Sequence, residues 1–258
     1  MDLKLAGKTA LITGSSDGIG FAIAKGLADE GVRVLINGRN QKNVEKACKE
    51  IGELAHPAVG DVAAVDGIAA IVKTCLDMGG VDILVNNAGT GSNETVMEAT
   101  DDKWQDYWDL HVMAAVRLAR GLVPSMEAKG AGIILNNASI CAVQPLWYEP
   151  IYNVTKSALM MLSRSLATEL VDKNIRVNCV NPGLVLTPDW IKTARELTRD
   201  TGGDWEGYLQ KVADEHAPIK RFCSPDEVAD FFVFLCSDRA SYSIGATYFV
   251  DGGMKKTV

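Results

Sequence analysis

The chain has 258 residues, of which 47% are hydrophobic and 23% are charged, and its formal net charge is −7. This length and apolar content suit one large domain with a buried core. The acidic balance, without any Lys/Arg-rich run, argues against nucleic acid and anionic membranes as partners.

The cysteines and the amino-terminal residues indicate in which cellular compartment the protein is expected. Six scattered cysteines with no CxxC pair predict reduced thiols in a cytoplasmic protein, and neither disulfides nor a metal site are expected. The opening stretch MDLKLAGKTALIT contains no long apolar run. We therefore expect neither a signal peptide nor a membrane-spanning segment.

Short β-branched runs alternate with longer helix-like stretches along the chain. Strands are predicted at 8–13, 32–37, within 54–62, and at 81–87, 130–139, 175–182 and 246–253. Helices are predicted at 18–31, 41–51, 65–78, 103–128 and 151–172. Nearly continuous apolar strands between helices predict an α/β fold, a Rossmann-like doubly wound seven-stranded parallel sheet with helices on both faces.

Residues 1–258 are expected to form this single domain, because no repeat, low-complexity tract or linker interrupts them. The segment at about 183–224 is the long irregular region. It is rich in Trp, Tyr, Asp and Gly and lacks a clear strand. We expect it to act as a lid over the substrate.

The first predicted strand runs into TGSSDGIG, with Gly14, Gly18 and Gly20 ahead of the first predicted helix. Glycines here let the backbone approach a pyrophosphate, and the free N–H groups at the helix amino end can bind it. The spacing is GxxxGxG, and a tight strand–helix connection is the plainer alternative. The position of the turn at the start of the fold favours a dinucleotide site.

The end of the second predicted strand faces the adenine ribose in such a fold, where an acid favours NAD. Here Gly38 stands at that place and Arg39 follows it. A charged hydrogen bond from an Arg to the 2′-phosphate of NADP is worth about 1.5–3 kcal/mol. Asp17 in the glycine turn opposes the same phosphate by a similar amount. The opposing effects of Arg39 and Asp17 weakly favour NADP as the cofactor, and NAD is the alternative.

The stretch YNVTK opens the predicted helix that follows the fifth strand. It places Tyr152 and Lys156 one turn apart on one helix face. Ser139 ends the fifth strand, at the edge where open α/β sheets bind ligands. A hydroxyl, a phenol and an ammonium can therefore converge beside the dinucleotide site.

In the order and spacing of its motifs, the chain resembles the short-chain dehydrogenase/reductase family, in its shorter single-domain branch. The resemblance covers nearly the whole chain. The matching pieces are TGSSDGIG, GDV at 60–62, NNAG at 86–89, Ser139 with Tyr152-x-x-x-Lys156, NPG at 181–183 followed by Thr187, and VDGG at 250–253.

The resemblance implies a role for each matching residue. Tyr152 is the expected general acid or base, Lys156 lowers the Tyr pKa and binds the nicotinamide ribose, and Ser139 holds the substrate oxygen. Asp61 and Val62 would contact adenine. The full set of expected cofactor contacts is Gly14, Ser16, Asp17, Gly18, Ile19, Gly20, Arg39, Asp61, Val62, Asn87, Ala88, Gly89, Tyr152, Lys156, Val185 and Thr187, the last two at the nicotinamide carboxamide.

One residue departs from the family pattern. The family usually carries an Asn on the long helix before the fifth strand, where it fixes a water that relays protons to the Lys. The matching residue here is His111. We expect His111 to hold that water as a fourth catalytic residue, because neutral imidazole both donates and accepts hydrogen bonds. The alternative is a helix His packed in a subunit contact.

Aromatic residues follow Ser139 and recur in the expected lid. Trp147, Tyr148 and Trp190 predict an apolar or aromatic substrate pocket, unless they only pack the lid onto the body. Glu149 and Asp189 argue mildly against a phosphorylated or carboxylated substrate.

These features predict an NAD(P)-dependent alcohol dehydrogenase or carbonyl reductase that interconverts a secondary alcohol and a ketone. A non-catalytic NAD(P)-binding sensor is the alternative. A nucleotide-sugar epimerase or dehydratase is disfavoured, since those chains carry a larger carboxyl-terminal region. The family usually forms homotetramers through two long helices, so the helices near 103–128 and 151–172 predict a homotetramer or a homodimer.

Overall fold

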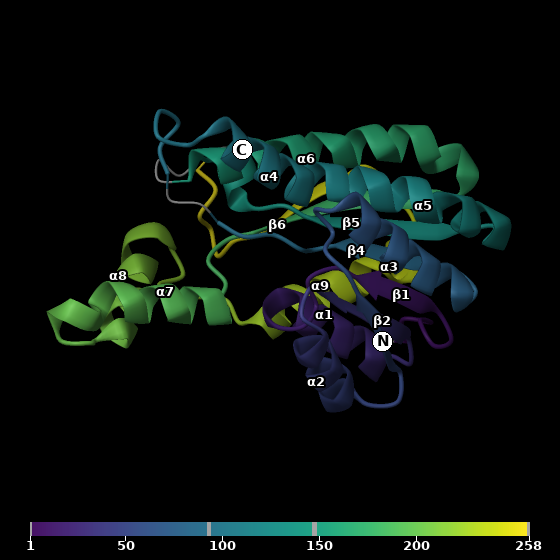
Figure 1. Ribbon diagram of the computed structural model, residues 1–258, viewed down its shortest axis with the longest axis horizontal. Coiled ribbons are helices and arrows are strands. Elements are labelled where there is room, and N and C mark those ends of the chain that lie inside the picture. The colour runs from purple at the N-terminus through teal and green to yellow at the C-terminus, as the bar shows by residue number, and fades with distance from the viewer. Residues whose placement is uncertain (1, 92–93, 146–148, 257–258) are drawn as a thin grey trace.

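The computed structural model describes residues 2–91, 94–145 and 149–256 (Figure 1). Within them, one parallel sheet has the strand order β3-β2-β1-β4-β5-β6-β7. The order reverses between β1 and β4, and ligands bind at the carboxyl ends of strands beside such a reversal. The strands are β1 Thr9–Ile12, β2 Arg33–Gly38, β3 Ala55–Val59, β4 Ile83–Asn86, β5 Gly132–Asn137, β6 Ile175–Pro182 and β7 Thr247–Val250.

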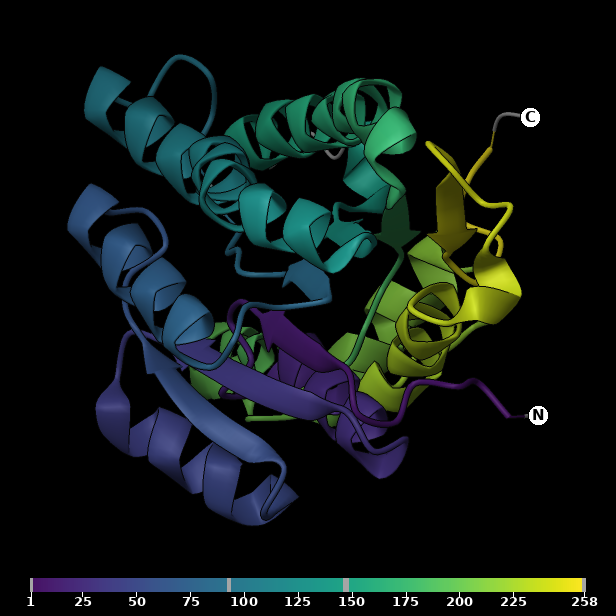
Figure 2. The same cartoon turned by 90° about the vertical axis from the view of Figure 1, so that its right-hand side faces the viewer.

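Helices cover both faces of the sheet (Figure 2). The apolar core on one face includes residues of α1, α2 and α9, and the core on the other face includes residues of α3, α5 and α6. The doubly wound fold is therefore confirmed. The helices are α1 Gly18–Asp29, α2 Gln41–Ile51, α3 Val65–Asp77, α4 Asp101–Trp108, α5 Ala114–Lys129, α6 Pro150–Leu170, α7 Pro188–Thr198, α8 Trp205–His216 and α9 Pro225–Leu235.

The burial of β1 explains why the strand sequences are continuous apolar runs. Ala10 and Ile12 are fully buried in the core beside α1 and α9, whereas Leu11 is fully buried in the opposite core. Successive side chains of a strand point to opposite faces, so a strand covered on both faces needs apolar residues at every position.

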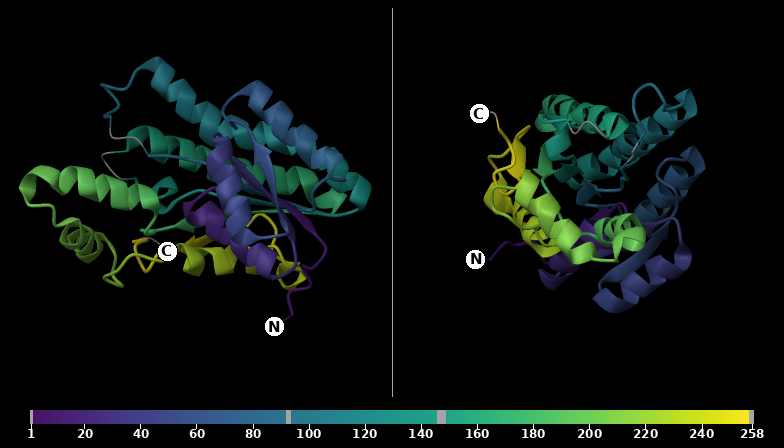
Figure 3. Two further views of the ribbon diagram at one scale, coloured as in Figure 1. Left: turned by 60° about the horizontal axis from the view of Figure 1, so that its bottom comes forward. Right: turned by 90° about the vertical axis from the view of Figure 1, so that its left-hand side faces the viewer.

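The segment 183–224 is helical, and the prediction of an irregular region there was wrong. It forms α7 and α8, which Figures 1 and 3 show projecting beyond the carboxyl ends of the strands. Each helix starts at a side-chain cap: Thr187 accepts from the backbone N–H of Trp190, and Asp204 from that of Gly207. Few residues of these helices are buried.

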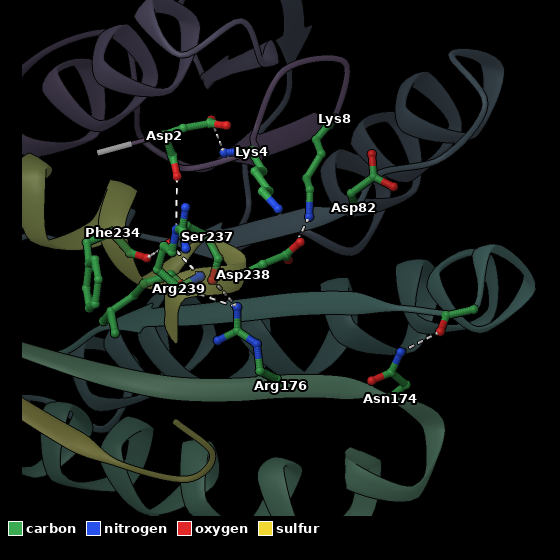
Figure 4. A network of polar contacts seen from close by, with 12 residues as sticks. Asp2, Lys4, Lys8, Asp82, Asn174, Arg176, Phe234, Ser237, Asp238 and Arg239 are labelled. Atoms are coloured by element: carbon green, nitrogen blue, oxygen red, sulfur yellow. Dashed lines mark hydrogen bonds and ion pairs between the residues drawn. The ribbon is translucent and has the colours of Figure 1, made fainter. Parts of the chain in front are cut away.

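Polar contacts hold together the segments at the amino ends of β6 and β1 (Figure 4). Arg176 of β6 donates through Nη2 to the carbonyl oxygens of Leu235 and Ser237, at 3.1 and 3.0 Å. Nζ of Lys8 lies 3.4 Å from Oδ1 of Asp238. These contacts tie β6 and the start of β1 to the end of α9.

All six cysteines carry free thiols, and four of them are buried. Within the described residues, no helix combines the length and the hydropathy needed to cross a bilayer.

Candidate active site

The glycine turn after β1 packs tightly against the end of β4. Gly14 and Gly18 adopt φ values of +59° and +57°, a region that side chains disfavour. A Cβ on Gly14 would lie 2.9 Å from Cα of Ala88, and a Cβ on Gly20 would overlap the carbonyl oxygen of Gly14. These glycines therefore leave a backbone cradle, at the amino end of α1, that fits a pyrophosphate.

Two asparagine side chains join the carboxyl ends of three strands. Nδ2 of Asn87 donates to the carbonyl oxygens of Thr13 and Gly14, at 2.9 and 3.1 Å, and its Oδ1 accepts from Nδ2 of Asn137 at 2.8 Å. The carbonyl oxygen of Asn137 in turn accepts from Nζ of Lys156 at 2.8 Å. The ammonium of Lys156 is thus connected to the glycine turn through two amides.

The structure brings together the Ser, Tyr and Lys that the sequence singled out. The hydroxyl of Ser139 lies near the phenol of Tyr152 and affects its pKa. Nζ of Lys156 lies 5.4 Å from the centre of the Tyr152 ring, and Lys156 is only 3% exposed. All three lie at the carboxyl edge of the sheet, at the end of β5 and in the first turns of α6.

Burial controls the pKa values of this group. It raises the pKa of Tyr152, as do the nearby Cys141 and Glu149, while the nearby hydroxyl of Ser139 lowers it. Burial also lowers the pKa of Lys156 to about 8. The family resemblance implied that Lys156 lowers the pKa of Tyr152, whereas burial acts in the opposite direction. The phenol therefore holds its proton at neutral pH.

His111 lies in a π-helical turn, Asp109–Met113, between α4 and α5. Its Nδ1 is 2.8 Å from Oγ1 of Thr155, and its Nε2 accepts from the backbone N–H of Thr90 at 3.3 Å. Since the Nε2 atom accepts, we assign the ring proton to Nδ1. Burial, and then Lys156, keep the pKa of His111 well below its usual value, so the imidazole is neutral.

The predicted water relay depends on the space around Gly89. A Cβ on Gly89 would lie 3.0 Å from Nε2 of His111 and 3.3 Å from Nζ of Lys156. A side chain at this position would therefore crowd both nitrogens. A water there would share Nε2 with the Thr90 amide, and the relay stays a prediction.

Arg39, which follows β2, and Asp17, in the glycine turn after β1, are both exposed. A Cβ on Gly38 would lie 3.0 Å from Cγ2 of Val44 and 3.3 Å from Oγ of Ser16, so an acidic side chain at this place would press on both neighbours. Ile19 is partly buried against the core beneath α1.

The loop after β3 holds the two residues expected at adenine. Val62 is buried, and Oδ1 of Asp61 accepts from the backbone N–H of Ala63 at 3.0 Å. Arg117 of α5 donates to the carbonyl oxygen of Ala63 at 3.1 Å and pairs with Oδ1 of Asp109 at 2.7 Å. Arg117 therefore connects this loop to the π-helical turn that carries His111.

The segment 183–224, which is expected to act as a lid, begins beside the glycine turn. A Cβ on Gly18 would lie 3.7 Å from Cγ2 of Thr187, which caps α7, and Val185 is buried two residues earlier. Trp190 packs edge-on against Phe222, at 5.3 Å between ring centres, in an apolar cluster that also includes Tyr152. Trp147 and Tyr148 lie outside the described residues.

Several contacts of the site were not predicted. Thr155, Asn137 and Arg117 hold His111, Lys156 and the loop after β3 by hydrogen bonds. Thr155 lies inside YNVTK, and its place in that motif was the available signal. Asn137 and Arg117 act across strands and helices that are distant in the sequence, and no local pattern marks them.

Comparisons with known proteins agree with this geometry. A family model described as enoyl-(acyl carrier protein) reductase matches residues 14–255. The "uncharacterized oxidoreductase YvrD" of Bacillus subtilis is 37% identical over 263 aligned residues, covering 100% of both chains. Human dehydrogenase/reductase SDR family member 4 is 37% identical over 254 residues, which cover 96% of this chain and 88% of that protein.

Two solved structures are also similar. L-Sorbose reductase from Gluconobacter frateurii, complexed with NADPH and L-sorbose, is 64% identical, with a TM-score of 0.99 and 100% of both chains covered. 3-Ketoacyl-(acyl-carrier-protein) reductase from Brucella melitensis, complexed with NADH, is 32% identical, with a TM-score of 0.86 and 97% and 99% covered. The motifs, the fold and these matches together show that the chain belongs to the short-chain dehydrogenase/reductase family of oxidoreductases.

Proposed function

We propose that this protein is an NADP-dependent reductase that converts the ketone of a small polyhydroxylated molecule, such as a ketose, to a secondary alcohol. The convergence of Ser139, Tyr152 and Lys156 beside the glycine turn carries the proposal. The full-length similarity to an L-sorbose reductase supports the substrate class.

The protonation states favour the direction of reduction. Tyr152 donates its phenolic proton to the carbonyl oxygen, and the hydroxyl of Ser139 hydrogen-bonds the same oxygen. Burial raises the pKa of Tyr152, so the phenol is protonated at neutral pH and gives up its proton only as negative charge develops on the carbonyl oxygen. The ammonium of Lys156 stabilises the phenolate that remains. A bound nicotinamide supplies the hydride.

Glu149 supports a hydroxylated substrate. It immediately precedes α6, three residues before Tyr152, and its Oε1 lies 2.7 Å from the point where a Cβ on Gly91 would stand. Burial, and then Asp189, raise the pKa of Glu149 to about 7. A partly buried carboxylate beside the acid Tyr accepts hydrogen bonds from substrate hydroxyls and repels anionic substrates.

The adenosine end supports NADP. Gly38 offers no acid to the ribose 2′-OH, and the packing of Val44 and Ser16 around it opposes one. Arg39 follows at the exposed strand end, where it can reach a 2′-phosphate.

The second candidate is the substrate predicted from the sequence, an apolar or aromatic ketone. It is favoured by the apolar cluster in which Tyr152, Trp190 and Phe222 pack together with the base of the lid. The two candidates differ in the surface that they require around the carbonyl, apolar in one case and hydrogen-bonding in the other.

The test is NADPH oxidation by purified protein with L-sorbose and, separately, with acetophenone. We expect turnover of the ketose, and Tyr152→Phe should lower it by roughly 10²–10⁴-fold while the Kd for NADPH changes less than about threefold. Tyr242→Phe, at a fully exposed Tyr, is the matched control. Turnover of acetophenone alone supports the second candidate. NADPH binding without turnover of either supports the sensor alternative.

A further inference from the structure

Gln144 fastens the loop that follows Ser139 to the carboxyl-terminal end of the chain. Its Nε2 donates to the carbonyl oxygen of Met254 at 3.1 Å, and its Oε1 accepts from the backbone N–H of Lys256 at 3.0 Å. The side-chain amide therefore pairs with one acceptor and one donor of the tail segment, residues 251–256. Among the natural side chains, only an amide offers both groups in this arrangement.

The tail segment is held against the substrate end of the site by further contacts. Met254 is 4% exposed and packs in one cluster with Ile140 and Cys141, which follow Ser139, and with Leu184 at the base of the lid. The carbonyl oxygen of Gly252 accepts from the backbone N–H of Ile219 at 3.2 Å. The tail segment thus contacts both the loop 140–145 and the chain that returns from the lid.

Consecutive hydrogen bonds connect Gln144 to Ser139. The backbone N–H of Gln144 donates to the carbonyl oxygen of Ile140 at 3.0 Å. The backbone N–H of Ala142 donates to the carbonyl oxygen of Ser139 at 3.0 Å, and that of Cys141 donates to Oγ of Ser139 at 3.1 Å. A displacement of Gln144 is therefore passed to the hydroxyl that is proposed to hold the substrate oxygen.

A second anchor holds the other side of this loop. Oγ of Ser157 on α6 donates to the carbonyl oxygen of Ala142 at 2.6 Å. The loop is therefore fixed between the catalytic helix and the tail segment. No hydrogen bond within the described residues joins the tail segment to the glycine turn or to the loop after β3.

We propose that Gln144 is a positioning residue for the carbonyl substrate. By binding the tail segment it fixes the loop 140–145, and with it Ser139, so that it sets the KM for the substrate and leaves nucleotide affinity unchanged. The inference rests on the proposed function for the identity of the substrate.

Gln144→Met tests the inference, since it keeps the length of the side chain and removes both hydrogen bonds. Gln210→Met is the matched control, because Gln210 on α8 also donates to two acceptors, in an exposed setting and without a hydrogen bond to the loop 140–145 or to residues 251–256 among the described residues. For Gln144→Met with NADPH and L-sorbose, we expect the KM for L-sorbose to rise about 5- to 50-fold, from the loss of two hydrogen bonds. The Kd for NADPH should change less than about twofold.

Hydrogen exchange on the NADPH-bound proteins gives a readout that needs no substrate. The amides of residues 140–144 and of Lys256 should exchange faster in Gln144→Met than in wild type and remain unchanged in Gln210→Met. An equal rise in KM in both variants, or a rise in the Kd for NADPH as large as the rise in KM, overturns the inference. If wild type does not reduce L-sorbose, the proposed function fails, and unchanged exchange at residues 140–144 then overturns this inference independently.

Discussion

His111 and Thr155 are locked together, with Nδ1 of the imidazole 2.8 Å from Oγ1 of the threonine. Oγ1 of Thr155 is itself 2.9 Å from the carbonyl oxygen of Ile151, to which it donates. The direction of both hydrogen bonds is therefore determined: the imidazole donates to the Thr155 hydroxyl, and this hydroxyl donates to the helix backbone. His111 thus connects the π-helical turn to the helix that carries Tyr152 and Lys156.

Replacement of His111 by Asn should lower kcat without altering the shape of the pH–rate profile. The shorter side chain cannot keep both the Thr155 and the Thr90 contacts, and misplacement by about 1 Å costs on the order of 10²-fold. The profile should keep its shape above about pH 6, because burial holds the pKa of His111 well below 6.5. Loss of an acidic limb in His111→Asn would show that His111 titrates during turnover.

Lys156→Met should abolish activity and change how stability depends on pH. Burial lowers the pKa of Lys156 to about 8 from 10.5, so the unfolded chain binds the extra proton between these values. The free-energy cost of burying the charged Lys156 side chain is fully present below pH 8. It decreases as the pH rises toward 10.5, so the folded state becomes more stable. In urea unfolding, wild type should gain about 2 kcal/mol relative to Lys156→Met from about pH 7 to about pH 9.5. The exposed control Lys211→Met should show no such difference from wild type, and a flat difference for Lys156→Met would contradict its burial as a cation.

The KM for a hydroxylated substrate should fall as the pH rises through about 7. Burial, and then Asp189, raise the pKa of Glu149 to about 7. The ionised carboxylate is a stronger hydrogen-bond acceptor than the protonated carboxyl group. Glu149→Gln should raise KM above pH 7 and remove this dependence, whereas Glu206→Gln on the exposed face of α8 should leave it intact. The same pH dependence of KM in Glu149→Gln as in wild type would assign it to another group.

Arg39→Gln should weaken NADPH binding about 10- to 100-fold and leave NADH binding unchanged, because only NADPH carries the 2′-phosphate. Titrations followed by nicotinamide fluorescence measure both affinities. Arg33→Gln, at the exposed opposite end of β2, is the control for net charge. An equal loss for both nucleotides would place Arg39 away from the 2′-phosphate.

Arg117→Gln should weaken the binding of both nucleotides about three- to tenfold, because it removes the bond to Ala63 and the half-buried pair with Asp109. Arg120, exposed on the same helix, supplies the control Arg120→Gln. Unchanged affinity in Arg117→Gln would mean that the loop after β3 is held without it.

Most of the fold was predictable because its signals are local. The strands are covered on both faces, so apolar runs mark them directly, and the predicted strands differ from β1–β7 mainly at their ends. The helices α7 and α8 were not predicted, because the Trp, Tyr, Asp and Gly content of their segment suggested an irregular region. The helix α9 was not predicted either, although Ser224 and Glu227 form a capping box that marks its start.

The sequence by itself determined the chemical groups of the site and their local spacing: the glycine turn, Ser139, and Tyr152 one helical turn from Lys156. Only the tertiary structure decided how these groups are held and ionised. Asn137, Thr155, Gln144 and Arg117 connect segments far apart in the chain, and the pKa values of Tyr152, Lys156 and Glu149 depend on burial. Spacing along one helix is a property of neighbouring residues, whereas solvation and long-range hydrogen bonds arise only when the chain packs.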